Sequence, residues 1–141
     1  MKIVIKRTSN EEIVRSLHKK TFPSDEFYES KKNVYWLAIA KYSTKEDEVV
    51  GFAVATELDH GILFLSRAGI IWKARGKGLQ KRLIRVRTNY ARKNNFKQAI
   101  TYTSVDNISS FLNLLRCKFM PYIPEYCYAG VNVIYLMRDL G

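Results

Sequence analysis

The sequence Ile-Ile-Trp-Lys-Ala-Arg-Gly-Lys-Gly-Leu-Gln occupies residues 70–80 and joins an apolar segment to the start of a helical pattern. Gly76 and Gly78 permit a positive φ and lack the Cβ atoms that would keep a phosphate away from the backbone. Consecutive N–H groups at such a turn, followed by the positive end of a helix dipole, form a seat for an anion. Arg75 and Lys77 add positive side chains beside it. We therefore expect this junction to bind a diphosphate.

The hydrophobic pattern on either side of this junction predicts a mixed α/β fold. Seven strands are predicted, at residues 2–7, 34–42, 49–57, 62–71, 98–103, 119–123 and 131–137. Helices are predicted after Ser9 or Asn10, over residues 79–93, and after Asp106 or Asn107. The strand at 62–71 is almost continuously apolar, which is typical of a central strand covered on both faces.

The composition indicates one folded domain over residues 1–141, because the chain is 47% hydrophobic and long enough to bury a sizeable core. No apolar run approaches the roughly 18 residues needed to span a bilayer, and residues 1–7 lack the apolar centre of a signal peptide. Cys117 and Cys127 form no paired motif, and the two histidines lie far apart in the sequence, so we expect no metal site. A reducing, cytoplasmic location is the default expectation.

The net charge of +11 is concentrated in one part of the chain. Residues 60–105 contain eleven Lys and Arg residues and no Asp or Glu, whereas the remaining thirteen basic residues are balanced by all thirteen acidic ones. The predicted helix at 79–93 carries five of these cations away from its apolar stripe: Lys81, Arg82, Arg85, Arg92 and Lys93. Such a surface concentrates anions, including nucleic acids and acidic proteins; a basic face kept for solubility is the alternative.

Over essentially its whole length, the chain resembles the GNAT acyltransferases. Their signature, Arg/Gln-x-x-Gly-x-Gly/Ala before the third helix, corresponds to residues 75–80, where Gln80 replaces a small residue. The family also has an Asn at the start of the next helix and an aromatic residue after it, and Asn107 and Phe119 match this spacing. The resemblance implies the GNAT fold, a mixed sheet of six or seven strands flanked by helices.

Binding of acetyl-CoA is the first functional implication of this resemblance. The diphosphate would contact the amides of the signature turn, at Arg75, Gly76, Lys77, Gly78, Leu79 and Gln80. The pantetheine arm would pair with the fourth strand at Ile70, Ile71 and Trp72, and Asn107 would bond to it or hold the neighbouring strand open. Ordinary core packing of the two isoleucines, covering of the strand end by Trp72, and helix capping by Asn107 are the alternatives.

Acetyl transfer to a primary amine by direct attack in a ternary complex requires a neutral amine and a proton for the leaving thiolate. A lysine amine, with a pKa near 10.4, is rarely neutral at pH 7, so it needs a general base more than an α-amine does. Family members often carry this base as Glu or Asp on the fourth strand, which has no carboxylate here. Glu57 is the candidate base, while Asp59 and His60 are better explained as turn residues.

The general acid of the family is often a Tyr seven residues after the Asn, a position that Leu114 occupies in this chain. Tyr128 is the candidate acid in its place, because the adjacent Ala-Gly permits close approach; Tyr122 and Tyr126 are alternatives. Packing over the cleft is the other explanation for these tyrosines. A mechanism with no side-chain acid, using water and the local positive charge, is also open.

Two functions fit these observations. The first is an acetyl-CoA-dependent N-acetyltransferase whose amine acceptor is acidic or associated with a nucleic acid, such as a charged tRNA. The second is a GNAT-like binding module without catalysis, which holds nucleic acid or a protein through the basic helix. The missing strand carboxylate, Leu114 and Gln80 favour the second function, whereas the intact Arg-Gly-Lys-Gly turn favours the first. A homodimer is compatible with either.

Overall fold

The structure, a computed structural model, describes residues Met1 to Gly141 and contains one seven-stranded mixed sheet, with strand order β1-β2-β3-β4-β5-β7-β6. Antiparallel pairing joins β1 (Lys2–Thr8), β2 (Asn33–Lys41), β3 (Glu48–Glu57) and β4 (Ile62–Ile70). On the other side of β4 lie β5 (Gln98–Ser104), β7 (Val133–Asp139) and β6 (Met120–Pro121). This arrangement confirms the predicted mixed α/β fold with a six- or seven-stranded sheet.

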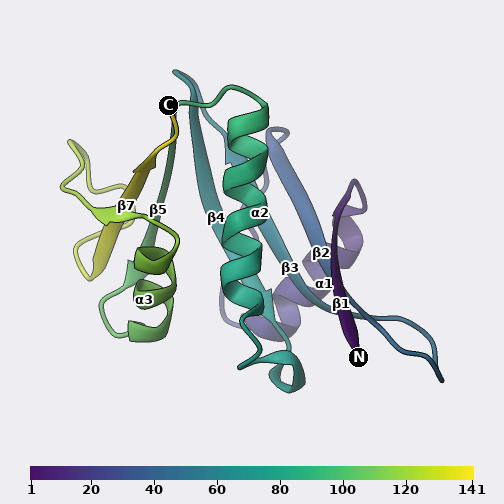
Figure 1. The fold of residues 1–141 in the computed structure, drawn as a ribbon. Helices are drawn as coiled ribbons and strands as arrows, with labels where there is room; N and C mark the ends of the chain where they lie inside the picture. Colours follow the sequence, from purple (N-terminus) through teal and green to yellow (C-terminus); the bar gives the residue numbers. More distant parts are fainter.

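Helices cover both faces of the sheet: α1 (Glu11–Thr21) lies on one, and α2 (Leu79–Lys93) and α3 (Ile108–Arg116) lie on the other (Figure 1). The predicted capping residues begin two of them, because the side chain of Asn10 accepts from the Ile13 N–H and that of Asn107 accepts from the Ser110 N–H. The bounds of α2 are the predicted ones. None of the helices has both the length and the apolar character needed to cross a membrane.

Two hydrophobic clusters hold these layers together. The larger contains 19 buried residues and joins Leu83 and Ile84 of α2 to Leu63 and Leu65 of β4. The smaller, on the α1 side, contains six buried residues, among them Leu17 and residues of β2 and β3. Burial of apolar area contributes about 25 cal/mol per Å² to the free energy of folding. The two clusters therefore hold β4 firmly between α1 and α2.

The central strands separate along half of their length. β4 pairs in parallel with β5 only from Ile62 to Phe64, and the strands then diverge toward the end of the sheet where α2 begins (Figure 1). Ser66 is an extra residue in β4, since the register with β3 shifts there and forms a β-bulge. The prediction that β4 is covered on both faces is therefore wrong beyond Phe64: Ser66, Arg67 and Ala68 remain partly exposed.

Two further elements differ from the sequence prediction. The strand predicted at 119–123 is only Met120–Pro121, although the Tyr122 N–H still donates to the Tyr135 carbonyl at 2.9 Å. The strand predicted to end at residue 71 ends at Ile70, and Trp72–Ala74 form a single 3₁₀ turn, η1, before the glycine turn.

Candidate active site

The turn between η1 and α2 presents a row of free backbone donors. The N–H groups of residues 76–81 donate to no acceptor in the protein, and the first turn of α2 contains no acidic residue. Gly76 and Gly78 have φ of +76° and +74°, and a Cβ atom added at either would meet no heavy atom within 4 Å. The turn is therefore open to an anion that approaches the backbone directly.

Arg75, Trp72 and Lys77 were predicted to contact the cofactor at this turn, and their side chains lie in different surroundings. The Arg75 Nε donates to the Ile70 carbonyl at 2.9 Å, and its guanidinium lies 5.6 Å from the centre of the Trp72 ring. The Trp72 ring contacts the Arg75 guanidinium. Because Trp72 is 82% exposed, its ring does not cover the end of β4. Lys77 is exposed beside the free N–H groups. Arg75 thus holds the strand end to the turn, and Lys77 is the mobile cation there.

A cavity of about 290 Å³ occupies the space between β4 and β5, below α2 and α3. Gln80 and Asn107, both predicted contacts, line this cofactor-side cavity. Gln80 also links the two helices, because its Oε1 accepts from Asn113 Nδ2 at 3.2 Å and its Nε2 lies 3.5 Å from the Ser110 hydroxyl. Asn107 caps α3 as well as lining the cavity, so the capping alternative is confirmed for it.

The edge of β4 that faces this cavity has free peptide groups. The Ile71 N–H donates to the Val50 carbonyl at 2.9 Å. Because hydrogen-bonded pairs alternate along an antiparallel ladder, the peptide groups of Ala68 and Ile70 face away from β3, toward the split. The Ile70 carbonyl accepts from Arg75 Nε, so the free groups are the Ile70 N–H and the N–H and carbonyl of Ala68. An extended ligand can pair with this edge as an additional strand.

A second cavity, of about 520 Å³, lies on the α1 side of the split. Aromatic and apolar side chains form most of its wall. They come from the loop after α1, the loop after β3, strands β4 and β5, and the loop before β7: Phe27, Tyr28, Leu58, Phe64, Tyr102 and Tyr128. This acceptor-side cavity shares Ser66, Arg67 and Tyr102 with the cofactor-side cavity. The two spaces therefore meet at the bulge of β4.

Tyr128, the predicted acid, lies in the wall of the acceptor-side cavity. Its ring packs against Phe64 at 5.9 Å, Tyr102 at 6.0 Å and Tyr135 at 5.0 Å between centroids. Tyr128 is 39% exposed, but the rings around it remove part of the water from its hydroxyl, and this desolvation, followed by the neighbouring hydroxyl of Tyr122, raises the pKa of Tyr128 above its usual value. Its hydroxyl therefore stays protonated near neutral pH and can act as a donor toward the cavity.

Glu57, the predicted base, lines neither cavity. Its Oε2 accepts a hydrogen bond from the Tyr90 hydroxyl at 2.7 Å, on the α2 side of the sheet. Burial, and then this contact, raise the pKa of Tyr90. The structure therefore does not bring Glu57 and Tyr128 into one site, because the last residue of β3 turns its side chain toward the end of α2.

His18 lines the acceptor-side cavity and was not predicted from the sequence as a site residue. It is only 3% exposed, lies against Phe22, Phe27 and Phe52, and makes no side-chain hydrogen bond within the protein. Every side-chain nitrogen that is fully buried in this protein has a hydrogen-bond partner. The ring nitrogens of His18 have none, so they are not fully buried and face the cavity that His18 lines. Burial, and then the charge of Arg67, lower the pKa of His18, which keeps the imidazole neutral near pH 7. Its α1 position follows ordinary core spacing and gave no signal.

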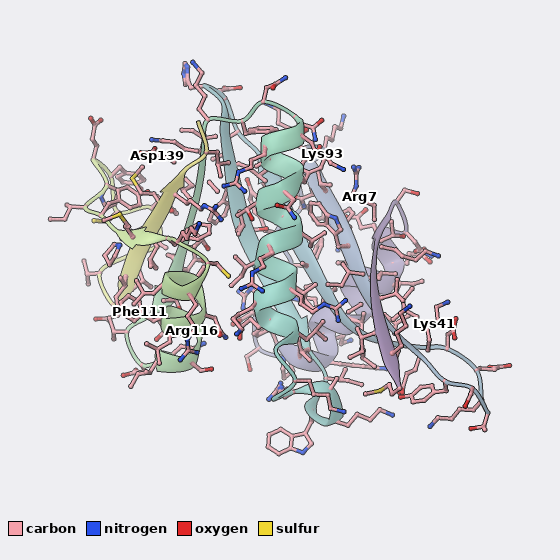
Figure 2. All side chains as sticks on the ribbon, in the orientation of Figure 1. Arg7, Lys41, Lys93, Phe111, Arg116 and Asp139 are labelled. Atoms are coloured by element: carbon pink, nitrogen blue, oxygen red, sulfur yellow. The ribbon has the colours of Figure 1, made fainter.

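Most cations of the basic face of α2 are exposed, namely Arg82, Arg85, Arg92 and Lys93, whereas Leu83, Ile84 and Ala91 of the same helix are buried. Lys93 lies at the C-terminal end of the helix (Figure 2). None of its exposed cations forms an ion pair with a carboxylate; Arg82 donates to the Ile3 carbonyl at 2.9 Å. The acceptor-side cavity is on the α1 side, so the concentration of positive charge and the acceptor-side cavity lie on different faces of the sheet.

Comparison with known families identifies the class of protein. Residues 7–119 match the model of the acetyltransferase (GNAT) family. The chain belongs to this family. Acetyl transfer is accordingly its class of reaction. A comparison with proteins of curated function gave no match.

Solved structures of other GNAT proteins share this fold along nearly the whole chain. The IAA acetyltransferase from Bacillus cereus is 19% identical, with a TM-score of 0.76, and the alignment covers 99% of this chain and 100% of that one. Arabidopsis thaliana NAA60, solved with acetyl-CoA, is 16% identical with a TM-score of 0.75, and 99% of each chain is covered. The Escherichia coli ribosomal-protein-S18-alanine N-acetyltransferase is 9% identical with a TM-score of 0.75, covering 99% and 94%. These similarities show the shared fold.

Proposed function

We propose that this GNAT protein is an N-acetyltransferase that moves the acetyl group of acetyl-CoA to a primary amine by direct attack in a ternary complex. The observation that carries the proposal is the meeting of two cavities at Ser66, Arg67 and Tyr102. One begins beside a row of free backbone donors, and the other is enclosed by aromatic side chains. A thioester and an amine that enter from opposite sides would come together at the β4 bulge.

The cofactor end has the features that coenzyme A requires. The free N–H groups of residues 76–81, with Lys77 beside them, suit the diphosphate. The open peptide groups of Ala68 and the open N–H of Ile70 suit the amide groups of the pantetheine arm. Gln80 and Asn107 border the path between these two points. Arg75, Ile71 and Trp72 contribute mainly by shaping the turn.

The acceptor end favours an amine borne on an apolar group. Aromatic rings dominate the acceptor-side cavity, and the charged side chains in its wall are Glu26 and Arg67, of which Arg67 pairs with Asp25 at 2.9 Å. An aromatic or branched aliphatic arm would bury its surface against Phe64 and Tyr128, at about 25 cal/mol per Å² of apolar area. A polyamine would leave its additional charges among these rings.

Proton transfer can be assigned to two residues in this cavity. The ammonium group of the acceptor loses a proton to the neutral imidazole of His18, and the amine nitrogen then attacks the carbonyl carbon of the thioester. The C–N bond forms and the C–S bond breaks, and the Tyr128 hydroxyl gives its proton to the thiolate as it takes the second proton from the amine nitrogen. The products are the N-acetyl amide, the coenzyme A thiol and a protonated His18. His18 thus takes the role that the sequence assigned to Glu57, since Glu57 faces the other side of the sheet.

The test is a thiol-release assay with acetyl-CoA and matched amines. We expect faster transfer to 2-phenylethylamine than to spermidine, with N-acetyl products identified by mass spectrometry. Phe64→Ala should raise KM for 2-phenylethylamine and leave acetyl-CoA affinity unchanged, because Phe64 lines only the acceptor-side cavity. Absence of acetyl-CoA binding in calorimetry would refute the proposal.

A second candidate function, binding of nucleic acid through the basic face of α2, has its own supporting observation: exposed cations with no acidic partner. This face lies across the sheet from the acceptor-side cavity. A nucleic acid could therefore bind there even if the amine that is acetylated belongs to another molecule. Affinity for a short RNA, measured by fluorescence anisotropy, should fall steeply with salt, and Arg85→Ala with Arg92→Ala should make the slope shallower by about two phosphate contacts. A flat salt dependence would exclude this function.

A further inference from the structure

Arg87 is a buried cation that has no counter-ion. It is 4% exposed in the middle of α2, and its Nε and Nη1 donate to the carbonyls of Leu83 at 3.0 Å and Val54 at 3.1 Å. No carboxylate lies within ion-pair distance of it. Its remaining nitrogen, Nη2, has no hydrogen-bond partner in the protein. Because every fully buried side-chain nitrogen does have a partner, Nη2 is not fully buried and faces the cofactor-side cavity that Arg87 lines.

This arrangement is costly for the protein alone. A buried charge is ordinarily paired, because its transfer from water to the protein interior is unfavourable. Burial lowers the pKa of Arg87 to about 9, yet the guanidinium remains charged near neutral pH. Two carbonyl groups supply hydrogen bonds but no negative charge. The site is therefore electrostatically complete only when an anion, or a developing negative charge, occupies the cavity beside Nη2.

Arg87 also lies at the right distance from the diphosphate seat. It is eight residues beyond Leu79, which places it roughly 12 Å along the helix axis at 1.5 Å per residue. An extended arm of about four peptide-like units, the size of pantetheine, spans this length. The Val54 carbonyl that Arg87 binds also accepts from the Ser66 hydroxyl at 3.3 Å. Arg87 thus lies at the level of the bulge where the two cavities meet.

We propose that Arg87 is a catalytic residue that stabilises the coenzyme A thiolate as it leaves. The inference rests on the proposed function. As the amine forms its C–N bond, the electron pair of the C–S bond moves to sulfur, and the resulting negative charge lies beside the Arg87 guanidinium. The Tyr128 hydroxyl then relays to this thiolate the second proton that the amine nitrogen loses. Arg87 remains charged throughout and gives up no proton.

The direct test is the pKa of the coenzyme A thiol in the complex, because it needs no acceptor. Coenzyme A is saturated with protein, iodoacetamide is added at a series of pH values, and the alkylated coenzyme A is quantified by mass spectrometry. Alkylation of Cys127 does not interfere, since only the coenzyme product is counted. We expect the thiol to titrate about one pH unit or more below free coenzyme A.

Two variants distinguish the outcomes. Arg87→Met should return the titration to that of free coenzyme A and lower kcat by about tenfold or more, with little change in acetyl-CoA affinity. Arg85→Met removes the same charge from the exposed side of the same helix and should leave the titration unchanged.

A wild-type titration equal to that of free coenzyme A would overturn the inference, and this result requires no variant to fold. An unchanged titration in Arg87→Met would also overturn it, because the charge would then act elsewhere. Failure of coenzyme A to bind at all, seen by calorimetry, would instead refute the proposed function.

Discussion

Gly76 and Gly78 show at the scale of single residues how the turn depends on the backbone. Their positive φ values are strained for any residue with a Cβ atom, although the space around both is open. Gly78→Ala should cost about 1–2 kcal/mol of unfolding free energy and should weaken acetyl-CoA binding, because the N–H groups of the turn would move. Gly130→Ala is the matched control: it has φ of +89° and equally open space, so it should lower stability and leave acetyl-CoA affinity unchanged. Urea unfolding and calorimetry measure the two effects; equal losses of affinity in both variants would contradict the turn as the seat.

His18 offers a prediction with a defined pH dependence. Its pKa is lowered by folding, so the unfolded chain binds the proton more tightly. The contribution of His18 should therefore leave the free energy of unfolding at its highest value above the ordinary histidine pKa of about 6.5, and this free energy should decrease as the pH falls below it. His18→Gln should remove this decrease and lower kcat/KM by about 10²- to 10⁴-fold. The activity ratio of wild type to variant should shrink at low pH, where His18 is protonated; a ratio independent of pH would exclude a role as base.

Neither His18 nor Arg87 could be recognised from the sequence as a site residue. A histidine on the apolar face of α1 has the pattern of a core residue, and an arginine among ten other cations of residues 60–105 has the pattern of a solvated one. His18 is buried with no hydrogen-bond partner and Arg87 is buried with no counter-ion, and both situations arise only when α1 and α2 pack on the sheet. The glycine turn, by contrast, was predicted correctly as a positive-φ turn, because its chemistry is local.

At the scale of elements, α2 was the most predictable part of the chain. Its apolar period, the preceding glycines and the terminal asparagines determine its bounds locally. The separation of β4 from β5 was not predictable. Residues 66–68 continue the extended pattern of β4, and no feature of their sequence indicates that β5 no longer pairs with them. That loss results from pairing between strands far apart in sequence, and it creates the cofactor-side cavity.

The link between α2 and α3 gives a prediction at this scale. Gln80 joins the helices through Asn113 and Ser110, and Gln80→Ala should reduce the free energy of unfolding by about 1 kcal/mol. Acetyl-CoA binding should persist, because the backbone N–H of residue 80 is retained. Urea denaturation and calorimetry test this pair of effects. Loss of binding without loss of stability would show that the side chain, and not the backbone, holds the cofactor.

At the scale of the whole molecule, the two cavities lie largely on opposite sides of the split in the sheet and share only its centre. Under the proposed function both substrates would be bound together, and no acetylated enzyme intermediate would form. Initial velocities measured at several fixed acetyl-CoA concentrations should give intersecting double-reciprocal lines. Parallel lines, together with a protein mass increased by one acetyl group after incubation with acetyl-CoA alone, would show a ping-pong mechanism instead.

We propose that acetyl-CoA binds with its diphosphate at residues 76–81 and its thioester at the β4 bulge, beside Arg87. A crystal structure of the complex with acetyl-CoA would locate both groups. We predict hydrogen bonds from the turn amides to the diphosphate, pairing of the pantetheine arm with Ala68 and Ile70, and the sulfur within reach of Arg87 Nη2. A diphosphate bound elsewhere, or a thioester that lies away from the junction of the two cavities, would show that the proposed binding mode is wrong.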